Sequence, residues 1–150
     1  MGNIILFDPV RSEAVSCRTF QVPITTIAPT ADSKFFAIGY ENGAMIIATL
    51  MPLFVVHHTL AHGSDSAYPV TEIAWHGSSS RQKSDMLATQ SDDGDLKVWS
   101  IAKPIDSGEP ARIVRMLKKP ENFGRSRNWM SWSRNGRIVQ YSDRCVQHVY

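Results

Sequence analysis

Two segments of the chain repeat the same order of residue types at a fixed distance. The first is FFAIGYENGAMIIATL, residues 35–50, and the second is DMLATQSDDGDLKVWSI, residues 85–101. Gly43 in the first segment aligns with Gly94, which lies 51 residues later. Self-similarity at a fixed period of this size is the signature of a repeat architecture, in which each unit packs against the next.

Parts of the same unit occur elsewhere along the chain. Similar lead-ins precede the two segments, ITTIAPT from Ile24 and VTEIAWH from Val70. GNIILFD, residues 2–8, aligns with GDLKVWS, and NWMSWSRNGRIVQYSD, residues 128–143, begins like a third lead-in. The chain therefore holds two whole units with a partial unit on either side.

Each unit is composed of β-strand segments. ITTIA, KFFAIGY, AMIIATL, DLKVWSI and RIVQYS are runs of β-branched and aromatic residues bounded by Gly, Asn, Asp and Pro. ENG and DDG lie between such runs and predict hairpin turns, because Asn or Asp before Gly tolerates the positive φ that these turns require. No segment has a helical period, so the sequence predicts an all-β chain of roughly 13 short strands.

The units resemble the repeats of the WD-repeat β-propeller family, which are about 40–45 residues long and form four-stranded blades. In the strongest unit, Trp99-Ser100 stands where the family has Trp-Asp, and the segment LFD at residues 6–8 is a second such ending. Ala48 occupies the aromatic position of another unit, and Ala61-His62 resembles the Gly-His pair before a blade. The resemblance implies an incomplete β-propeller of about three four-stranded antiparallel blades.

The blade boundaries follow from the same alignment. Residues 1–20 would form the outer strands of a split blade, residues 24–60 and 70–117 two blades, and residues 127–150 an incomplete blade. A propeller typically needs four to eight blades to close its ring, so residues 1–150 are not expected to close one alone. Three explanations stay open: a longer protein, assembly of several copies through open blade edges, or another molecule that covers the edges.

The resemblance also assigns a role to the residues around the DDGD turn. In such blades a loop His, a strand hydroxyl, a turn Asp and the Trp form a hydrogen-bonded set that stiffens the blade. Here the matching residues are His62, Thr89 (or Ser91), Asp93 and Trp99. Asp93 would accept a bond from the His62 ring, and the Trp99 indole would donate its N–H.

The sequence gives little evidence for a metal-binding site or a catalytic site. The acidic turn at residues 92–95 lacks the Glu that an EF-hand loop places at a fixed distance after its Gly. HHTLAH, residues 57–62, lacks a fourth zinc ligand or a companion Cys. There is no GxSxG motif and no Gly-rich loop that ends in Lys-Ser/Thr. We therefore expect no metal, no cofactor and no enzymatic activity.

Positive charge is concentrated in one stretch. Residues 112–137 hold eight Lys and Arg residues and one acidic residue, Glu121, whereas the whole chain has a formal net charge of only +2. Phe123, Trp129 and Trp132 are interleaved with these charges. This mixture fits a nucleic-acid or phosphate-binding surface as well as an ordinary solvated loop. The candidate surface residues are Lys118, Lys119, Arg125 and Arg127.

The resemblance to the WD-repeat family implies a non-enzymatic protein–protein interaction scaffold that binds other proteins or associates with itself. The alternative is a nucleic-acid or phosphate-binding module that uses residues 112–137. The two cysteines, Cys17 and Cys145, have no CxxC spacing, which is typical of a reducing compartment, so we expect an intracellular location in the cytoplasm or nucleus. No apolar run approaches the roughly 18 residues of a membrane span, and no membrane partner is expected.

Overall fold

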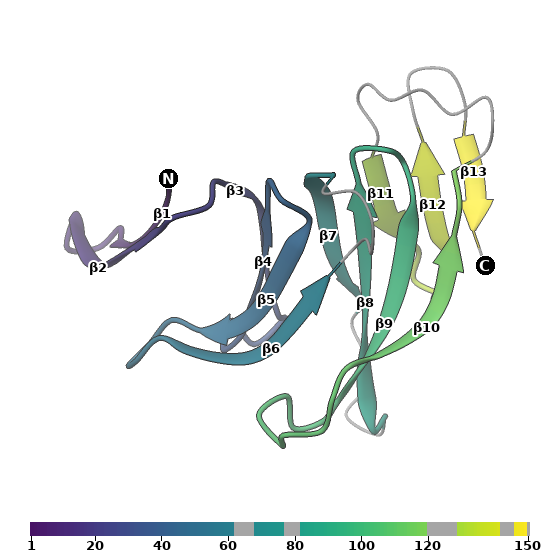
Figure 1. The fold of residues 1–150 in the computed structure, drawn as a ribbon. Coiled ribbons are helices and arrows are strands. Elements are labelled where there is room, and N and C mark those ends of the chain that lie inside the picture. The colour runs from purple at the N-terminus through teal and green to yellow at the C-terminus, as the bar shows by residue number, and fades with distance from the viewer. Residues whose placement is uncertain (62–67, 77–81, 120–128, 142–145, 150) are drawn as a thin grey trace.

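The computed structural model describes residues 1–61, 68–76, 82–119, 129–141 and 146–149, and only the backbone of residues 16, 17 and 146–149 (Figure 1). These residues form thirteen strands in four antiparallel sheets and contain no helix. The all-β prediction is therefore confirmed, and the described residues include no helix that could cross a membrane.

Each sheet is formed by strands that follow one another in the sequence. The first sheet pairs β1 (Gly2–Asp8) with β2 (Glu13–Phe20). The second contains β3 (Ile24–Pro29), β4 (Phe36–Tyr40), β5 (Ala44–Thr49) and β6 (Val55–Ala61). The third contains β7 (Val70–His76), β8 (Ser84–Ser91), β9 (Leu96–Ala102) and β10 (Arg112–Leu117). The fourth contains β11 (Trp129–Trp132), β12 (Ile138–Tyr141) and β13 (Val146–Val149).

The two turns that the repeat predicts connect the central strands of the second and third sheets. Gly43 has a φ of 79° and donates its N–H to Tyr40 O at 3.1 Å. Gly94 has a φ of 88° and donates to Ser91 O at 2.8 Å. Both glycines adopt the left-handed conformation that a side chain would disfavour, so the predicted hairpin turns are confirmed.

The sheets follow one another along the molecule (Figure 1), and β7 contacts β3 and β4 of the sheet before it and β11 of the sheet after it. Three apolar clusters fill the spaces between them. One, around Ile38 and Tyr40, joins β1–β2 to β3–β6, and another, around Leu87 and Trp99, joins β3–β6 to β7–β10. The third includes Leu96 and Met130 and joins β7–β10 to the fourth sheet. The core is therefore divided into layers between sheets rather than gathered in one centre.

Close approach between the second and third sheets requires a glycine at one position. A Cβ atom built on Gly39 of β4 would lie 2.9 Å from the Cβ of Val70 and 2.8 Å from Cγ2 of Thr26. Such a contact is too short for real side chains to accept without a shift. Gly39 therefore allows β7 to pack directly against the backbone of the preceding sheet.

Candidate functional site

The predicted blade set begins with a buried hydrogen bond between β8 and β9. The Trp99 indole N–H donates to Thr89 Oγ1 at 3.0 Å, and both side chains lie in the interior. Trp99 pairs with Leu87 across the strands, and Thr89 pairs with Lys97. The side chains of Thr89 and Trp99 thus meet diagonally on one face, where the indole gains an acceptor that water cannot supply.

Asp93 contacts the turn to which it belongs. It accepts a hydrogen bond from the Ser91 hydroxyl and a second one from the Asp95 N–H at 3.0 Å. Carboxylates that bond to the backbone two residues on are a standard way to fix a tight turn. His62 lies outside the described residues, so its predicted bond to Asp93 stays a prediction.

Two of the four predicted surface lysines and arginines are described, and both interact with one carboxylate. The Lys118 ammonium lies 2.6 Å from Asp95 Oδ2, and the Lys119 backbone N–H donates to Asp95 Oδ1 at 3.1 Å. The hydrogen bond that the Lys118 ammonium donates to the Asp95 carboxylate raises the pKa of Lys118. The charge of Lys118 is therefore shared with the acidic turn of the same sheet. Arg125 and Arg127 lie outside the described residues.

Tryptophans in two successive sheets make the same contact with the sheet before them. Trp75 at the end of β7 donates its indole N–H to Ala28 O on β3 at 3.0 Å. Trp132 at the end of β11 donates to Ala74 O on β7 at 2.9 Å. This repeated bond joins the first strands of neighbouring sheets. The sequence alignment pairs Trp75 with Trp132, but it cannot reveal the carbonyl acceptors.

Buried His58 and half-buried Glu72 also form contacts between neighbouring sheets. His58 Nε2 lies 2.8 Å from Ile105 O, on the loop between β9 and β10. Glu72 on β7 accepts the Met130 N–H at 2.8 Å through Oε2. Burial raises the pKa of the Glu72 carboxyl, and the bond from Met130 opposes this shift. Sequence reasoning missed Glu72, since a lone carboxylate on a strand gives no sign of its long-range partner.

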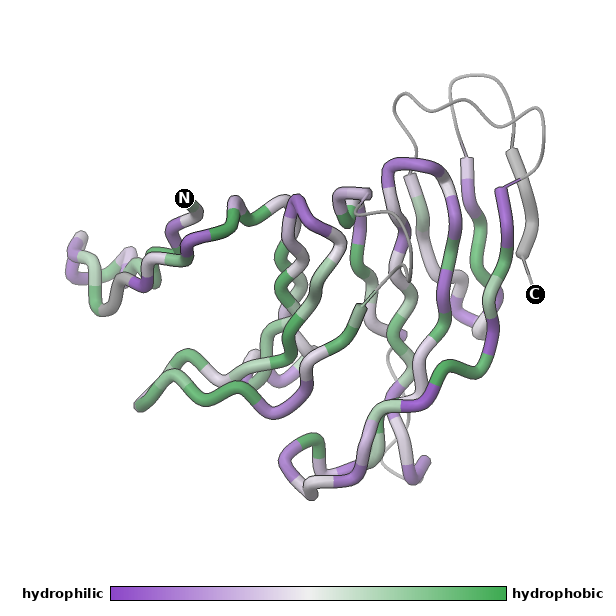
Figure 2. The backbone as a smooth tube through the Cα atoms, in the orientation of Figure 1, coloured by the Kyte–Doolittle hydropathy of each residue, from purple (hydrophilic) through white to green (hydrophobic). Residues whose placement is uncertain are grey.

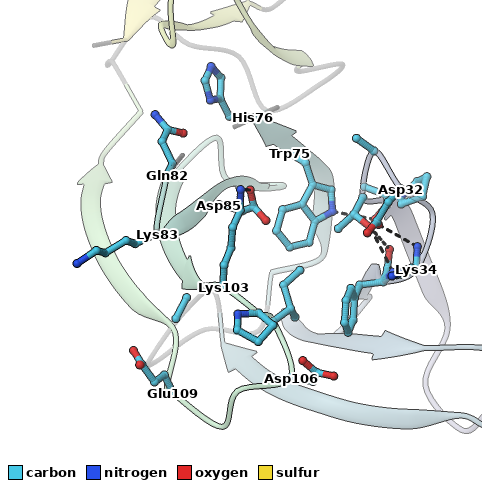
Figure 3. A pocket seen from close by; sticks show the side chains of 18 residues that line it. Asp32, Lys34, Trp75, His76, Gln82, Lys83, Asp85, Lys103, Asp106 and Glu109 are labelled. Carbon is cyan, nitrogen blue, oxygen red and sulfur yellow. Dashed lines mark hydrogen bonds and ion pairs between the residues drawn. The ribbon is translucent and has the colours of Figure 1, made fainter. Parts of the chain in front are cut away.

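A cleft of about 1380 Å³ opens between the sheets β3–β6 and β7–β10 (Figure 3). Trp75, Phe35 and Ile105 are among the residues that line it. Inside it Lys103 and Asp85 form an ion pair at 3.1 Å, with both side chains largely shielded from water. The cleft thus combines apolar contact area with fixed polar groups, as ligand-binding sites do.

Charged side chains of both signs also line the cleft. Asp32, Asp106 and Glu109 contribute carboxylates, and Lys34 and Lys83 contribute ammonium groups. Asp32 accepts bonds from the Thr30 hydroxyl at 2.6 Å and the Lys34 N–H at 3.1 Å, and these bonds lower the pKa of its carboxyl. Asp32 is therefore ionised at neutral pH and held in one orientation.

Within the described residues, no three His, Cys, Asp or Glu side chains are arranged so that they could hold a metal ion. The acidic residues of the DDGD turn do not converge on one point there, because Asp93 bonds within the turn and Asp95 bonds to Lys118 and Lys119. These contacts account for the acidic turn in structural terms.

Comparison with solved structures identifies the fold. A chain in the crystal structure of the mitotic checkpoint complex aligns with 92% of this chain at a TM-score of 0.63 and 14% identity. The WD40 domain of SCAP from fission yeast aligns with 99% of this chain at a TM-score of 0.59 and 10% identity. The chain folds as a partial WD40 propeller. Its match covers 37% of each of these two chains, and no protein-family model or curated protein matches it.

The WD40 fold confirms the incomplete β-propeller that the repeats predict, with four-stranded antiparallel blades in its two complete sheets. In this fold the cleft lies between two successive blades, and Trp75 supplies both a cleft wall and the bond to the preceding blade. Low identity to the structural neighbours limits the likeness to the fold. The assignment of function therefore depends on the features of this chain.

Proposed function

We propose that the chain is part of a non-enzymatic interaction scaffold, and that the cleft between blades β3–β6 and β7–β10 binds an extended segment of a partner protein. The observation that carries the proposal is the cleft itself, with its apolar walls of Trp75, Phe35 and Ile105. Aromatic residues at such a site offer large contact area at low cost in conformational entropy.

The charges of the cleft favour a segment that carries both signs. Lys34 and Lys83 can contact carboxylates, while Asp106 and Glu109 can contact lysine or arginine. Charges at the rim of an interface act mainly on specificity and association rate, whereas the desolvated centre supplies most of the affinity. One structural neighbour belongs to a multi-protein assembly, the mitotic checkpoint complex, which is consistent with a scaffold.

A displayed library of 12-residue peptides, selected against the chain, tests this proposal. The selected peptides should lose at least about tenfold in affinity for a chain with Asp106→Lys and Glu109→Lys, because the cleft charge is reversed. Glu41→Lys and Asp92→Lys provide the matched control, since both carboxylates are exposed and lie in turns outside the cleft lining. Equal affinity for both variants would show that the peptides bind elsewhere.

The alternative function is a nucleic-acid or phosphate-binding module that uses residues 112–137. The net charge of this stretch supports it, and Arg112 is exposed on the outer strand β10. The pairing of Lys118 with Asp95 weakens it, because a paired cation contributes less to phosphate binding. Self-association and a cytoplasmic or nuclear location are further parts of the proposal.

A further inference from the structure

The strand β6 forms an edge of its sheet and lacks the charged side chains and the proline that usually protect edges. Among the described residues, the sheet order β3-β4-β5-β6 leaves one side of β6 without a neighbouring strand. Its sequence, VVHHTLA, contains no Lys, Arg, Asp, Glu or Pro. Natural proteins commonly protect an exposed edge with charged side chains or proline, because unpaired N–H and C=O groups invite another strand.

The hairpin that leads into β6 is apolar over its whole tip. Residues 50–56, LMPLFVV, are seven consecutive apolar residues, and no formal charge occurs between Glu41 and Asp65. Figure 2 shows this hairpin as a hydrophobic projection beyond the rest of its sheet. Met51 is 48% exposed, Leu53 72%, Val55 45% and Val56 43%. Such a run of exposed apolar residues is unusual for a surface without a partner.

The other complete blade treats its edge differently. Both edge strands contain a register shift, but β10 also places exposed Arg112 and Arg115 among its apolar residues. Charges of this kind discourage pairing with a further strand. On its inner side, β6 pairs with β5. At the end of β6, the Lys97 ammonium donates a hydrogen bond to Ala61 O at 3.5 Å. The contrast marks β6 as the edge available for pairing.

We propose that β6 pairs antiparallel with β6 of a second copy of this chain, about a two-fold axis. A neutral strand suits its own copy because no like charges meet across the axis. With the axis near Val56, the two apolar hairpins would lie side by side and shield each other's Leu53, Val55 and Val56 from water. A two-fold interface of this type is closed and gives a dimer rather than a fibre. The proposal rests on the self-association proposed above and names the strand responsible.

Sedimentation velocity over a concentration series of the 150-residue chain tests the proposal. We expect a reversible monomer–dimer equilibrium. The variant with Val55→Lys and Val56→Lys should raise the dissociation constant at least about tenfold, because four ammonium groups would meet at the interface. Val114→Lys on β10 is the matched control, since Val114 is also an edge-strand valine and is 47% exposed. It should leave the equilibrium unchanged.

Hydrogen exchange locates the interface independently of the variants. Amides of β6 should exchange more slowly at high than at low protein concentration, whereas amides of β10 should not respond. A monomer at all concentrations, equal weakening by Val114→Lys, or concentration-dependent protection at β10 alone would overturn the proposal. A monomer that co-sediments with phosphatidylcholine vesicles would instead assign the hairpin to a lipid surface. Loss of dimerisation without loss of peptide binding would leave the cleft proposal intact.

Discussion

Replacing Thr89 with Val tests the bond between β8 and β9 with little change in side-chain shape. The substitution removes the only atom of this side chain that can accept the Trp99 N–H, which lies 3.0 Å away. Trp99 is 5% exposed and Thr89 0%, so water has poor access to the indole nitrogen. A buried donor without an acceptor costs about 1–3 kcal/mol. The bond from Thr89 to Lys97 O, at 3.5 Å, is too long to add much.

Urea denaturation followed by circular dichroism measures this cost. With a typical urea slope of about 1–3 kcal/mol/M, the midpoint should fall by roughly 1 M. Thr19→Val is the control, because Thr19 lies on β2 with its side chain exposed. In a Trp99→Phe background, Thr89→Val should cost less, since no indole N–H remains to be satisfied. A Thr89→Val midpoint equal to that of Thr19→Val would refute the reasoning.

Three further predictions concern the DDGD turn, the half-buried carboxylate of Glu72 and the basic stretch at residues 112–137. Asp93→Ala should lower the free energy of unfolding by about 1–3 kcal/mol in the same denaturation assay, because the Ser91 hydroxyl loses its acceptor; an unchanged midpoint would contradict this. Glu72→Gln should raise the urea midpoint at pH 7, because the amide oxygen can still accept the Met130 N–H while a half-buried charge is removed. Because the folded-state pKa of Glu72 is raised, the ionised carboxylate destabilises the folded chain fully above that pKa. The gain in stability from Glu72→Gln should therefore shrink as the pH falls toward the unfolded-state pKa of Glu72. A gain that stays constant with pH would show another cause. Anisotropy titrations with a labelled oligonucleotide should show only generic binding, with a dissociation constant of about 10⁻⁴–10⁻⁶ M near physiological salt. Tighter binding with a slope of log K against log salt near −3 to −4 would favour the nucleic-acid function instead. In that case, neutralising Lys118, Lys119, Arg125 and Arg127 should abolish the binding.

Local sequence patterns predicted the strands and turns well, because these depend on residues close in the chain. The ENG and DDG turns need Gly43 and Gly94 at positive φ, and the flanking runs of β-branched residues can form little except strands. The alignment of the repeat units then assigned these strands to successive blades. The fold was therefore accessible from the spacing of a few turn residues and the aromatic position at Trp99.

Contacts between blades were not predictable in the same way. Trp75 and Trp132 bond to backbone carbonyls of Ala28 and Ala74, and a carbonyl acceptor leaves no trace in the sequence. The basic stretch shows the opposite problem, because its charge was evident but the partner of Lys118 was not. Asp95 lies 23 residues earlier in the chain, and only the alignment of β9 with β10 brings the two side chains together.

One register position shows how blades of the same fold tolerate different interior chemistry. In the pairing of first and second strands, Ile38, Thr89 and Gln140 occupy equivalent places, opposite Ile27, Ile73 and Met130. All three of these second-strand side chains are buried. Thr89 accepts the Trp99 N–H within its blade, whereas Gln140 donates to Gly94 O of the preceding blade at 2.7 Å.

In the blade β3–β6, Ile38 occupies this position and has no hydroxyl, and Ala48 stands where the blade β7–β10 has Trp99. Loss of both partners avoids the penalty that loss of one would impose, because no buried donor or acceptor is left unsatisfied. The blade β3–β6 thus replaces a polar contact with an apolar one, while β7–β10 keeps it. The hydrogen bond is therefore an addition to a fold that the packed layers between the sheets already specify, and Thr89→Val removes that addition from the blade β7–β10.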